Sequence, residues 1–187
     1  LHPHLKCSNI LIDSEASVRL ADFGLSGSLY EAGERRSRAK TFVGSPGWMA
    51  PEVLEQASGY DASADVWSLG ITAIELATGR APHADLPPLK VLLQVLQGEP
   101  PTLARGSRGF KELVGLCLQR EPARRASVEK LLRGRALSAL GDAATRRWLL
   151  PIVRSLPPLQ ERYEALHGRS VEAATADAPP TAAAAPA

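Results

Sequence analysis

The residues near the N-terminus whose side chains could do chemistry are His2, His4, Lys6, Asn9 and Asp22. Asp22 carries an anionic oxygen ligand and Asn9 a neutral one, and Mg²⁺ prefers hard oxygen ligands of this kind. The alternative for both is structural, because Asp and Asn also close turns at the ends of strands. His2 and His4 would place two imidazoles on one side of an extended segment. No third ligand is nearby, so they do not indicate a zinc site.

Two short apolar-rich runs would position Asn9 and Asp22. Residues 9–13 and 18–22 are joined by Ser-Glu-Ala-Ser at 14–17, a composition typical of a tight turn between two strands. We therefore predict a small β-hairpin. Residues 25–45 then change to Gly, Ser, Glu and Arg without sustained periodicity, which predicts a long loop. Loops of this length in compact domains are usually functional or disordered.

The rest of the body is predicted to be mainly helical. Pro51 opens a short helix over residues 51–56, because its fixed φ suits the first helical position. The strongest helical pattern covers Ser63–Thr78 and ends at Gly79. Its apolar residues lie around most of the circumference, so this helix is expected inside the domain. Those residues are Val66, Trp67, Leu69, Ile71, Ile74 and Leu76. Further amphipathic segments, separated by Gly- or Pro-containing breaks, lie at residues 89–97, 110–119 and 128–133.

The helical pattern weakens beyond about residue 134, although residues 143–153 and 159–167 each suit a helix. Residues 168–187 are almost wholly Ala, Pro, Thr and small polar residues. This segment has nothing large enough to bury, which predicts a flexible tail.

Composition narrows the class of protein. A chain of 187 residues with 44% hydrophobic and 22% charged side chains suits one soluble globular domain plus some extra sequence. The net charge of +2 gives no strong field for nucleic acid or an anionic membrane. Cys7 and Cys117 belong to no CxxC or Cys/His cluster, which argues against a disulfide framework and favours a reducing, intracellular setting. No apolar stretch reaches the roughly 20 residues of a membrane span.

Three motifs follow one another in the order and spacing that identify a family. They read His2-Pro3-His4-Leu5-Lys6-Cys7-Ser8-Asn9, then Asp22-Phe23-Gly24, then Ala50-Pro51-Glu52. Together they resemble the catalytic loop, the DFG motif and the APE motif of protein kinases. A lone Asp-Phe-Gly is a weak signal, but all three in order are highly specific. Residues 40–52 and 67–79 look like the sterile-twenty-type kinases, especially the oxidative-stress-responsive and proline-alanine-rich group, and the resemblance covers about residues 1–132.

The resemblance implies phosphoryl transfer, which needs Mg²⁺ held against the β- and γ-phosphates of ATP and an oriented substrate hydroxyl. Asn9 and Asp22 are then the metal ligands and contribute to the cofactor site. Lys6 looks like the lysine that contacts the transferring phosphate and marks Ser/Thr specificity; the alternative is a solvated surface lysine. Ser45 looks like the hydroxyl residue of the substrate-adjacent loop, although a plain turn serine explains it about equally well.

Thr41 resembles the activation-loop phosphorylation site of the family. Phosphorylation would add about −1.5 to −2 charge, which can order a loop when paired with arginine. A basic cluster precedes it, formed by Arg35, Arg36, Arg38 and Lys40. Such a charge run alone would more often be a solvated face or a weak look-alike of a nuclear-localisation signal. Its position within the loop favours the regulatory interpretation.

Other matching residues belong to the scaffold. Asp65 resembles the family aspartate that accepts hydrogen bonds from the catalytic-loop backbone. A buried carboxylate needs such donors, because burying it without them would be costly. Glu52 and Arg125 resemble the buried ion pair that links the APE motif to later helices. His2 and Phe23 look like two members of the hydrophobic column of active kinases, and their presence predicts that the lobe folds.

The pattern breaks where the family reads His-Arg-Asp, because this chain reads His2-Pro3-His4. His4 therefore stands at the position of the catalytic base. A histidine is longer than a carboxylate and differently shaped, and Lys6 and Mg²⁺ beside it oppose its protonation. Misplacing a general base commonly removes about 10²- to 10⁴-fold in rate, so weak or absent transfer is expected. Pro3 removes the arginine that normally pairs with the phosphorylated activation loop, so phosphorylated Thr41 loses its main partner unless the local Arg cluster replaces it.

These observations predict an intracellular, cytoplasmic Ser/Thr protein kinase that uses ATP and Mg²⁺ and acts on protein substrates under an upstream kinase. The fold class is mainly α, within the α+β kinase family: a C-terminal lobe with a small β-hairpin. The expected divisions are the kinase lobe at residues 1–133, a helical extension at 134–167 and the tail at 168–187. The chain opens at Leu1 without the Gly-rich loop, the strand lysine or its helix glutamate, so we expect a fragment without the N-lobe.

Two alternatives remain open at this point. The first is a pseudokinase that serves as a scaffold or allosteric binding module, because His4 replaces the catalytic aspartate. The second is a nonfunctional truncated product. An intact glycine loop and Val-Ala-x-Lys motif upstream would favour nucleotide binding, and their absence would favour the scaffold or the relic.

Overall fold

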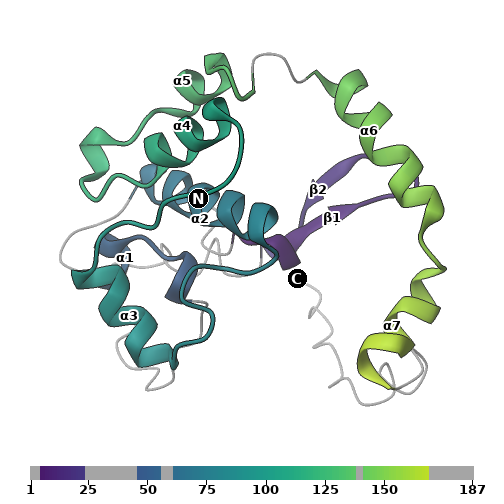
Figure 1. Ribbon diagram of the computed structural model, residues 1–187, viewed down its shortest axis with the longest axis horizontal. Helices are drawn as coiled ribbons and strands as arrows, with labels where there is room; N and C mark the ends of the chain where they lie inside the picture. The colour runs from purple at the N-terminus through teal and green to yellow at the C-terminus, as the bar shows by residue number, and fades with distance from the viewer. Residues whose placement is uncertain (1–4, 24–45, 56–60, 138–140, 169–187) are drawn as a thin grey trace, which may run out of the picture.

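The computed structural model describes residues 5–23, 46–55, 61–137 and 141–168 (Figure 1). It contains a mainly helical body, one β-hairpin and two helices towards the C-terminus. The fold class predicted from the sequence is confirmed. Several predictions fall outside the described residues: those on the loop at 25–45, on the tail beyond Gly168, and on His2, Pro3, His4, Gly24, Thr41 and Ser45.

The predicted hairpin is present. Strands β1 (Ile10–Ile12) and β2 (Val18–Leu20) pair antiparallel. Asp13 closes the turn between them, since its Oδ1 accepts the backbone N–H groups of Glu15 at 3.0 Å and Ser17 at 2.9 Å. The Ser17 N–H, donated to the charged form, is the main reason that the pKa of Asp13 is lowered.

Helix α2 (Ser63–Thr78) is the centre of the body, with the bounds that its sequence pattern predicts. Trp67 and Ile71 are each 1% exposed, so the middle of the helix is fully covered. Gly79 ends the helix in the left-handed conformation, with φ of 78°, and returns its N–H to the Glu75 carbonyl at 2.8 Å. Glycine adopts this conformation without steric cost, so it is a common residue after a helix.

The other body helices are α1 (Pro51–Glu55), α3 (Pro88–Gln97), α4 (Arg108–Cys117) and α5 (Val128–Arg133), with short 3-10 turns η1 (Cys7–Asn9), η2 (Pro46–Trp48) and η3 (Pro122–Arg124). Helix α4 begins two residues earlier than expected, because the Ser107 hydroxyl accepts the Phe110 N–H at 3.2 Å and caps the helix. Helix α4 packs on α2 at Gly70, where an added Cβ would lie 2.7 Å from the Cβ of Cys117. The absence of a side chain there brings the two helices together.

One core prediction on α2 is wrong. Leu76 belongs to the apolar pattern of the helix, yet 67% of it is exposed. Burial along α2 ends at Ile74, while the helix continues to Thr78. The last turn therefore extends past the elements that cover the middle of the helix.

Helices α6 (Asp142–Ser155) and α7 (Leu159–His167) follow the body. Figure 1 shows α6 beside the outer end of the hairpin, and the Arg146 guanidinium donates to the Ser17 hydroxyl at 3.0 Å there. Trp148 on α6 is 74% exposed. Across the part of the chain that the structure describes, no helix is both long and apolar enough to cross a bilayer.

Candidate functional site

The hairpin brings Asn9 and Asp22 together at its open end. Asn9 precedes β1 and Asp22 follows β2, so antiparallel pairing places them side by side. The Asn9 amide donates to the Asp22 carboxylate with 3.3 Å between Nδ2 and Oδ2. Asp22 has a φ of 65°, in the left-handed region that few residues other than glycine adopt. Ala16 and His83 also have positive φ, so this conformation is compatible with a functional role of Asp22 but does not by itself assign one.

Lys6 lies three residues before Asn9, in the segment that leads into the hairpin. Its backbone is extended, with φ of −157° and ψ of 163°, and its carbonyl accepts the Asn9 N–H at 3.0 Å across the η1 turn. Three of the residues predicted for the site, Lys6, Asn9 and Asp22, are therefore close in the structure. The other two predicted catalytic residues, His4 and Ser45, lie outside the described residues.

The donor set of this site suits Mg²⁺ shared with a ligand. Within the described ranges, no group of three or more His, Cys, Asp or Glu residues could hold a metal ion alone. Mg²⁺ is usually bound by one or two carboxylates together with phosphate oxygens and water. Asp22 and Asn9 fit that pattern, because each carries a hard oxygen on side chains that are in contact, and the remaining positions are left to phosphates.

A polar stripe on α2 holds the segments that flank this site. The stripe consists of Ser68, Thr72 and Glu75, which share one face of the helix by their i, i+4 and i+7 spacing. The Ser68 hydroxyl donates to the Trp48 carbonyl at 2.8 Å, and the Thr72 hydroxyl is 3.1 Å from the Leu5 carbonyl. These two bonds tie η2 and the segment before η1 to the same helix.

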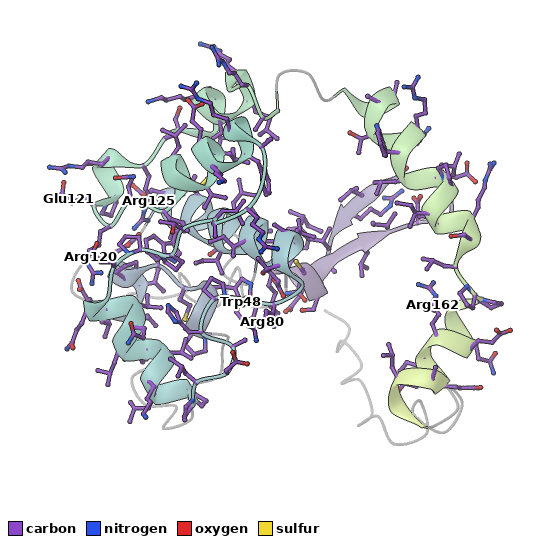
Figure 2. The ribbon with its side chains drawn as sticks, viewed as in Figure 1. Trp48, Arg80, Arg120, Glu121, Arg125 and Arg162 are labelled. Carbon is purple, nitrogen blue, oxygen red and sulfur yellow. The ribbon has the colours of Figure 1, made fainter. Side chains whose placement is uncertain are left out.

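Glu75 completes the polar stripe with two further bonds. Its Oε2 accepts the Cys7 backbone N–H at 3.1 Å and the Trp48 indole N–H at 2.9 Å. Figure 2 shows Trp48 beside α2. The sequence interpretation missed this stripe. Its signal is the recurrence of polar residues along one face of a helix that is otherwise apolar, because buried polar groups need partners.

Cys7 is held in a form that does not favour thiolate chemistry. Its Sγ lies 3.8 Å from the Thr72 carbonyl. Burial, and then the hydrogen bond and negative charge of Glu75, raise the pKa of the Cys7 thiol to about 12. Nucleophilic cysteines have lowered pKa values, so the contacts of Cys7 indicate a structural residue.

Glu52 and Arg125 form an ion pair that joins α1 to the segment before α5. The Nη1–Oε1 and Nη2–Oε2 distances are 2.5 and 2.7 Å. The Arg125 side chain is 0% exposed and the Glu52 side chain is 17% exposed. The same guanidinium also donates to the carbonyls of Gln119, Ser63 and Arg120 and lies 5.2 Å from the centre of the Trp67 ring. Figure 2 shows Arg125 and Arg120 close together at this end of the body.

The structure describes Asp65 and Phe23, but the scaffold roles expected for them stay predictions. Asp65 is half-buried in the first turn of α2. Phe23 is 58% exposed beside Asp22. His2, the other member of the expected hydrophobic column, lies outside the described residues.

The protein kinase domain family matches residues 1–135 of the chain. This chain belongs to the protein kinase family. The kinase is 46% identical over 172 residues to serine/threonine-protein kinase fray2 of Dictyostelium discoideum, covering 89% of this chain and 16% of the relative. It is 48% identical over 146 residues to germinal center kinase 3 of Caenorhabditis elegans, covering 71% of this chain and 24% of the relative. Hippo of Drosophila melanogaster is 37% identical over 168 residues, covering 88% of this chain and 24% of the relative.

These relatives are Ser/Thr protein kinases of the sterile-twenty type, which confirms the resemblance seen in the motifs. The kinase chain spans about a sixth to a quarter of the length of these relatives. Its helical body and hairpin correspond to the lobe that carries the catalytic loop and the DFG and APE motifs.

Proposed function

We propose that this kinase chain is the catalytic-loop lobe of an enzyme that transfers the γ-phosphoryl group of ATP to Ser or Thr hydroxyls of proteins. The observation that carries the proposal is the Asn9–Asp22 pair, with 3.3 Å between Nδ2 and Oδ2 at the open end of the hairpin. A neutral and an anionic oxygen ligand at one point suit Mg²⁺ bound to phosphates. The family and the names of its relatives support the same reaction.

Each site residue has a distinct part in this proposal. Mg²⁺, when bound, would offset the negative charge of the phosphates. Asp22 supplies the anionic ligand from a left-handed backbone position that follows β2. Asn9 supplies the neutral oxygen and restrains Asp22 through their hydrogen bond. Lys6 is three residues from Asn9, and its ammonium group would bind an oxygen of the transferring phosphate.

The hairpin surface supports a role as a platform for nucleotide. Its register places Ile12, Val18 and Leu20 on one face and Leu11 on the other, and all four are between 44% and 53% exposed. A two-stranded hairpin alone is marginally stable in water, so apolar faces of this kind usually pack against something. We propose that they contact the nucleotide base and the part of the kinase that binds it.

A second candidate function follows from the residue at the catalytic-base position. His4 stands where the family has an aspartate, and Pro3 stands where it has an arginine. If imidazole cannot take the substrate proton from this position, the lobe would act as a pseudokinase that binds protein partners without transfer. In both cases we propose protein partners and an upstream kinase acting on Thr41. The free thiols of Cys7 and Cys117 suit a reducing, cytoplasmic setting.

The experiment compares variants of the full-length kinase with its nucleotide-binding lobe in place. We expect His4→Asp combined with Pro3→Arg to raise phosphate transfer to a generic Ser/Thr substrate by about 10²- to 10⁴-fold. Adding Asp22→Ala to that pair should abolish transfer and weaken Mg-ATP binding. Glu15→Ala, a change in the exposed turn at the other end of the hairpin, is the control and should leave both unchanged.

Two results would contradict parts of this proposal. If the double variant binds Mg-ATP but stays as inactive as the parent, His4 does not explain the loss of activity. If the parent is already fully active, imidazole serves as the base and the pseudokinase candidate is wrong. If Asp22→Ala affects Mg-ATP binding no more than Glu15→Ala does, the metal assignment of Asp22 is wrong.

A further inference from the structure

Glu75 connects two segments of the kinase that are far apart in sequence. One acceptor oxygen, Oε2, receives both the Cys7 backbone N–H at 3.1 Å and the Trp48 indole N–H at 2.9 Å. The two donors lie 68 and 27 residues from Glu75 along the chain. Glu75 is therefore one side chain that binds both segments, whereas Ser68 and Thr72 each bind one of them.

The two segments carry the residues expected to act on opposite sides of the transferring phosphate. Cys7 begins the η1 turn that ends at Asn9, so a shift of Cys7 moves the metal-binding residue. Trp48 ends the η2 turn, three positions after Ser45 of the substrate-adjacent loop. The rate of phosphoryl transfer depends on the distance between these two segments, because a misplacement of about 1 Å can cost roughly 10²-fold in rate.

We propose that Glu75 is a positioning residue that holds the catalytic loop at a set distance from the substrate-adjacent loop. The proposal rests on the kinase function proposed above. Within the part of the chain that the structure describes, the side-chain hydrogen bonds of Glu75 go to Cys7 and Trp48, so we propose that it acts through these two residues.

The chemistry of the contact explains why a carboxylate suits this position. Two N–H donors converge on one oxygen, and charge-assisted hydrogen bonds are roughly twice as strong as neutral ones. Helix α2 makes the support rigid, since it is buried through its middle and Thr72 on the same face binds Leu5. Glutamine would keep an acceptor oxygen but lose the charge, whereas alanine would lose both bonds. Glu75→Gln should thus be intermediate between the parent and Glu75→Ala.

The first test uses the 187-residue chain and does not depend on activity. In Glu75→Ala we expect faster hydrogen exchange at the Cys7 amide and a shift of the Trp48 indole resonance, with the resonances of Trp67 and Trp148 unmoved. Alkylation of Cys7 by iodoacetamide should also accelerate several-fold, because the Cys7 segment loses the bond that holds it to α2 and opens more often. Cys117 is 0% exposed and makes no contact with Glu75 in the described hydrogen bonds, so it is the internal control. Glu112→Ala, at an exposed position on α4, is the matched variant.

The second test measures steady-state kinetics in the full-length kinase that carries His4→Asp and Pro3→Arg. We expect Glu75→Ala to lower kcat by about 10- to 100-fold with little change in KM for ATP, and Glu75→Gln to recover part of kcat. Glu112→Ala should leave kcat unchanged. Urea unfolding of each variant separates positioning from stability, because a purely structural role would lower kcat only in proportion to the unfolded fraction.

The outcomes test separately the positioning role of Glu75 and the proposed kinase function. If the Cys7 and Trp48 readouts of Glu75→Ala match those of Glu112→Ala, Glu75 does not hold these segments and the positioning proposal is overturned. If they respond but kcat follows only the unfolded fraction, the contact is structural and the proposal is again overturned. If the kinase is inactive both with His4 and with His4→Asp, the proposed function is refuted. The exchange and alkylation readouts would still decide whether Glu75 links the loops.

Discussion

Arg125→Leu should be among the most destabilising single changes in this lobe. The Arg125 side chain is 0% exposed, and all of its guanidinium nitrogens donate hydrogen bonds. Leucine keeps much of the volume but leaves the Glu52 carboxylate, only 17% exposed, without its cation. The carbonyls of Gln119, Ser63 and Arg120 lose the same donor.

The expected magnitude follows from the cost of breaking a buried pair by removing one partner, about 3–5 kcal/mol. For a chain of this size, 1 kcal/mol corresponds to roughly 2–4 °C in Tm, so a loss near 4 kcal/mol predicts a decrease of about 8–16 °C. The double variant Glu52→Leu with Arg125→Leu should be less destabilised than Arg125→Leu alone, because it no longer buries an unpaired charge.

Urea unfolding of the 187-residue chain, followed by far-UV circular dichroism, measures these differences. Arg124→Ala is the matched control, since the neighbouring Arg124 makes a salt bridge to Glu121 with both side chains 72% and 64% exposed. Exposed pairs contribute about 0–1 kcal/mol, so the control should remain near the parent. An Arg125→Leu variant within 1 kcal/mol of Arg124→Ala would refute the claim that the buried pair supports the lobe.

Three further predictions concern packing, thiol chemistry and the tail. Gly70→Ala should destabilise the chain by about 1–3 kcal/mol in urea, since its methyl group would meet Cys117 at 2.7 Å; unchanged stability would mean that α2 and α4 can separate without cost. Burial and Glu75 raise the pKa of Cys7 to about 12, and burial raises that of Cys117 to about 11, from 9.0. The unfolded thiols ionise first, so the free energy of unfolding should fall as pH rises above about 9, and at pH 8 a disulfide reagent should react much faster after unfolding. Deleting residues 169–187, which keeps Gly168 at the end of α7, should leave Tm unchanged, because this composition offers little apolar surface to bury; a marked decrease would show that the tail packs on the body.

Local signals in the sequence determined much of this protein. The order of the three motifs indicated the family, and the family match over residues 1–135 confirms it. The bounds of α2 followed from helical periodicity and from Gly79, whose φ of 78° ends the helix. The hairpin followed from two apolar runs around a turn closed by Asp13. These features depend on residues that are neighbours in the chain, so the sequence alone contains their physical cause.

The antiparallel pairing of a predicted hairpin also placed Asn9 near Asp22, because both flank the same two strands. Their separation and the left-handed backbone of Asp22 come only from the structure. The start of α4 could be predicted from the sequence only in part. Ser107 is a recognisable capping residue, but the apolar pattern placed the helix start at Phe110, two residues after its observed start at Arg108.

Only the tertiary structure decided the environments of two adjacent residues on α2. By type, Leu76 suits the core and Glu75 suits the solvent, yet Leu76 is 67% exposed and Glu75 binds both Cys7 and Trp48. Periodicity indicates which residues share a face of a helix, but it does not indicate what lies opposite that face. The partners of Glu75 come from segments 68 and 27 residues away, which meet only when the chain has folded around α2.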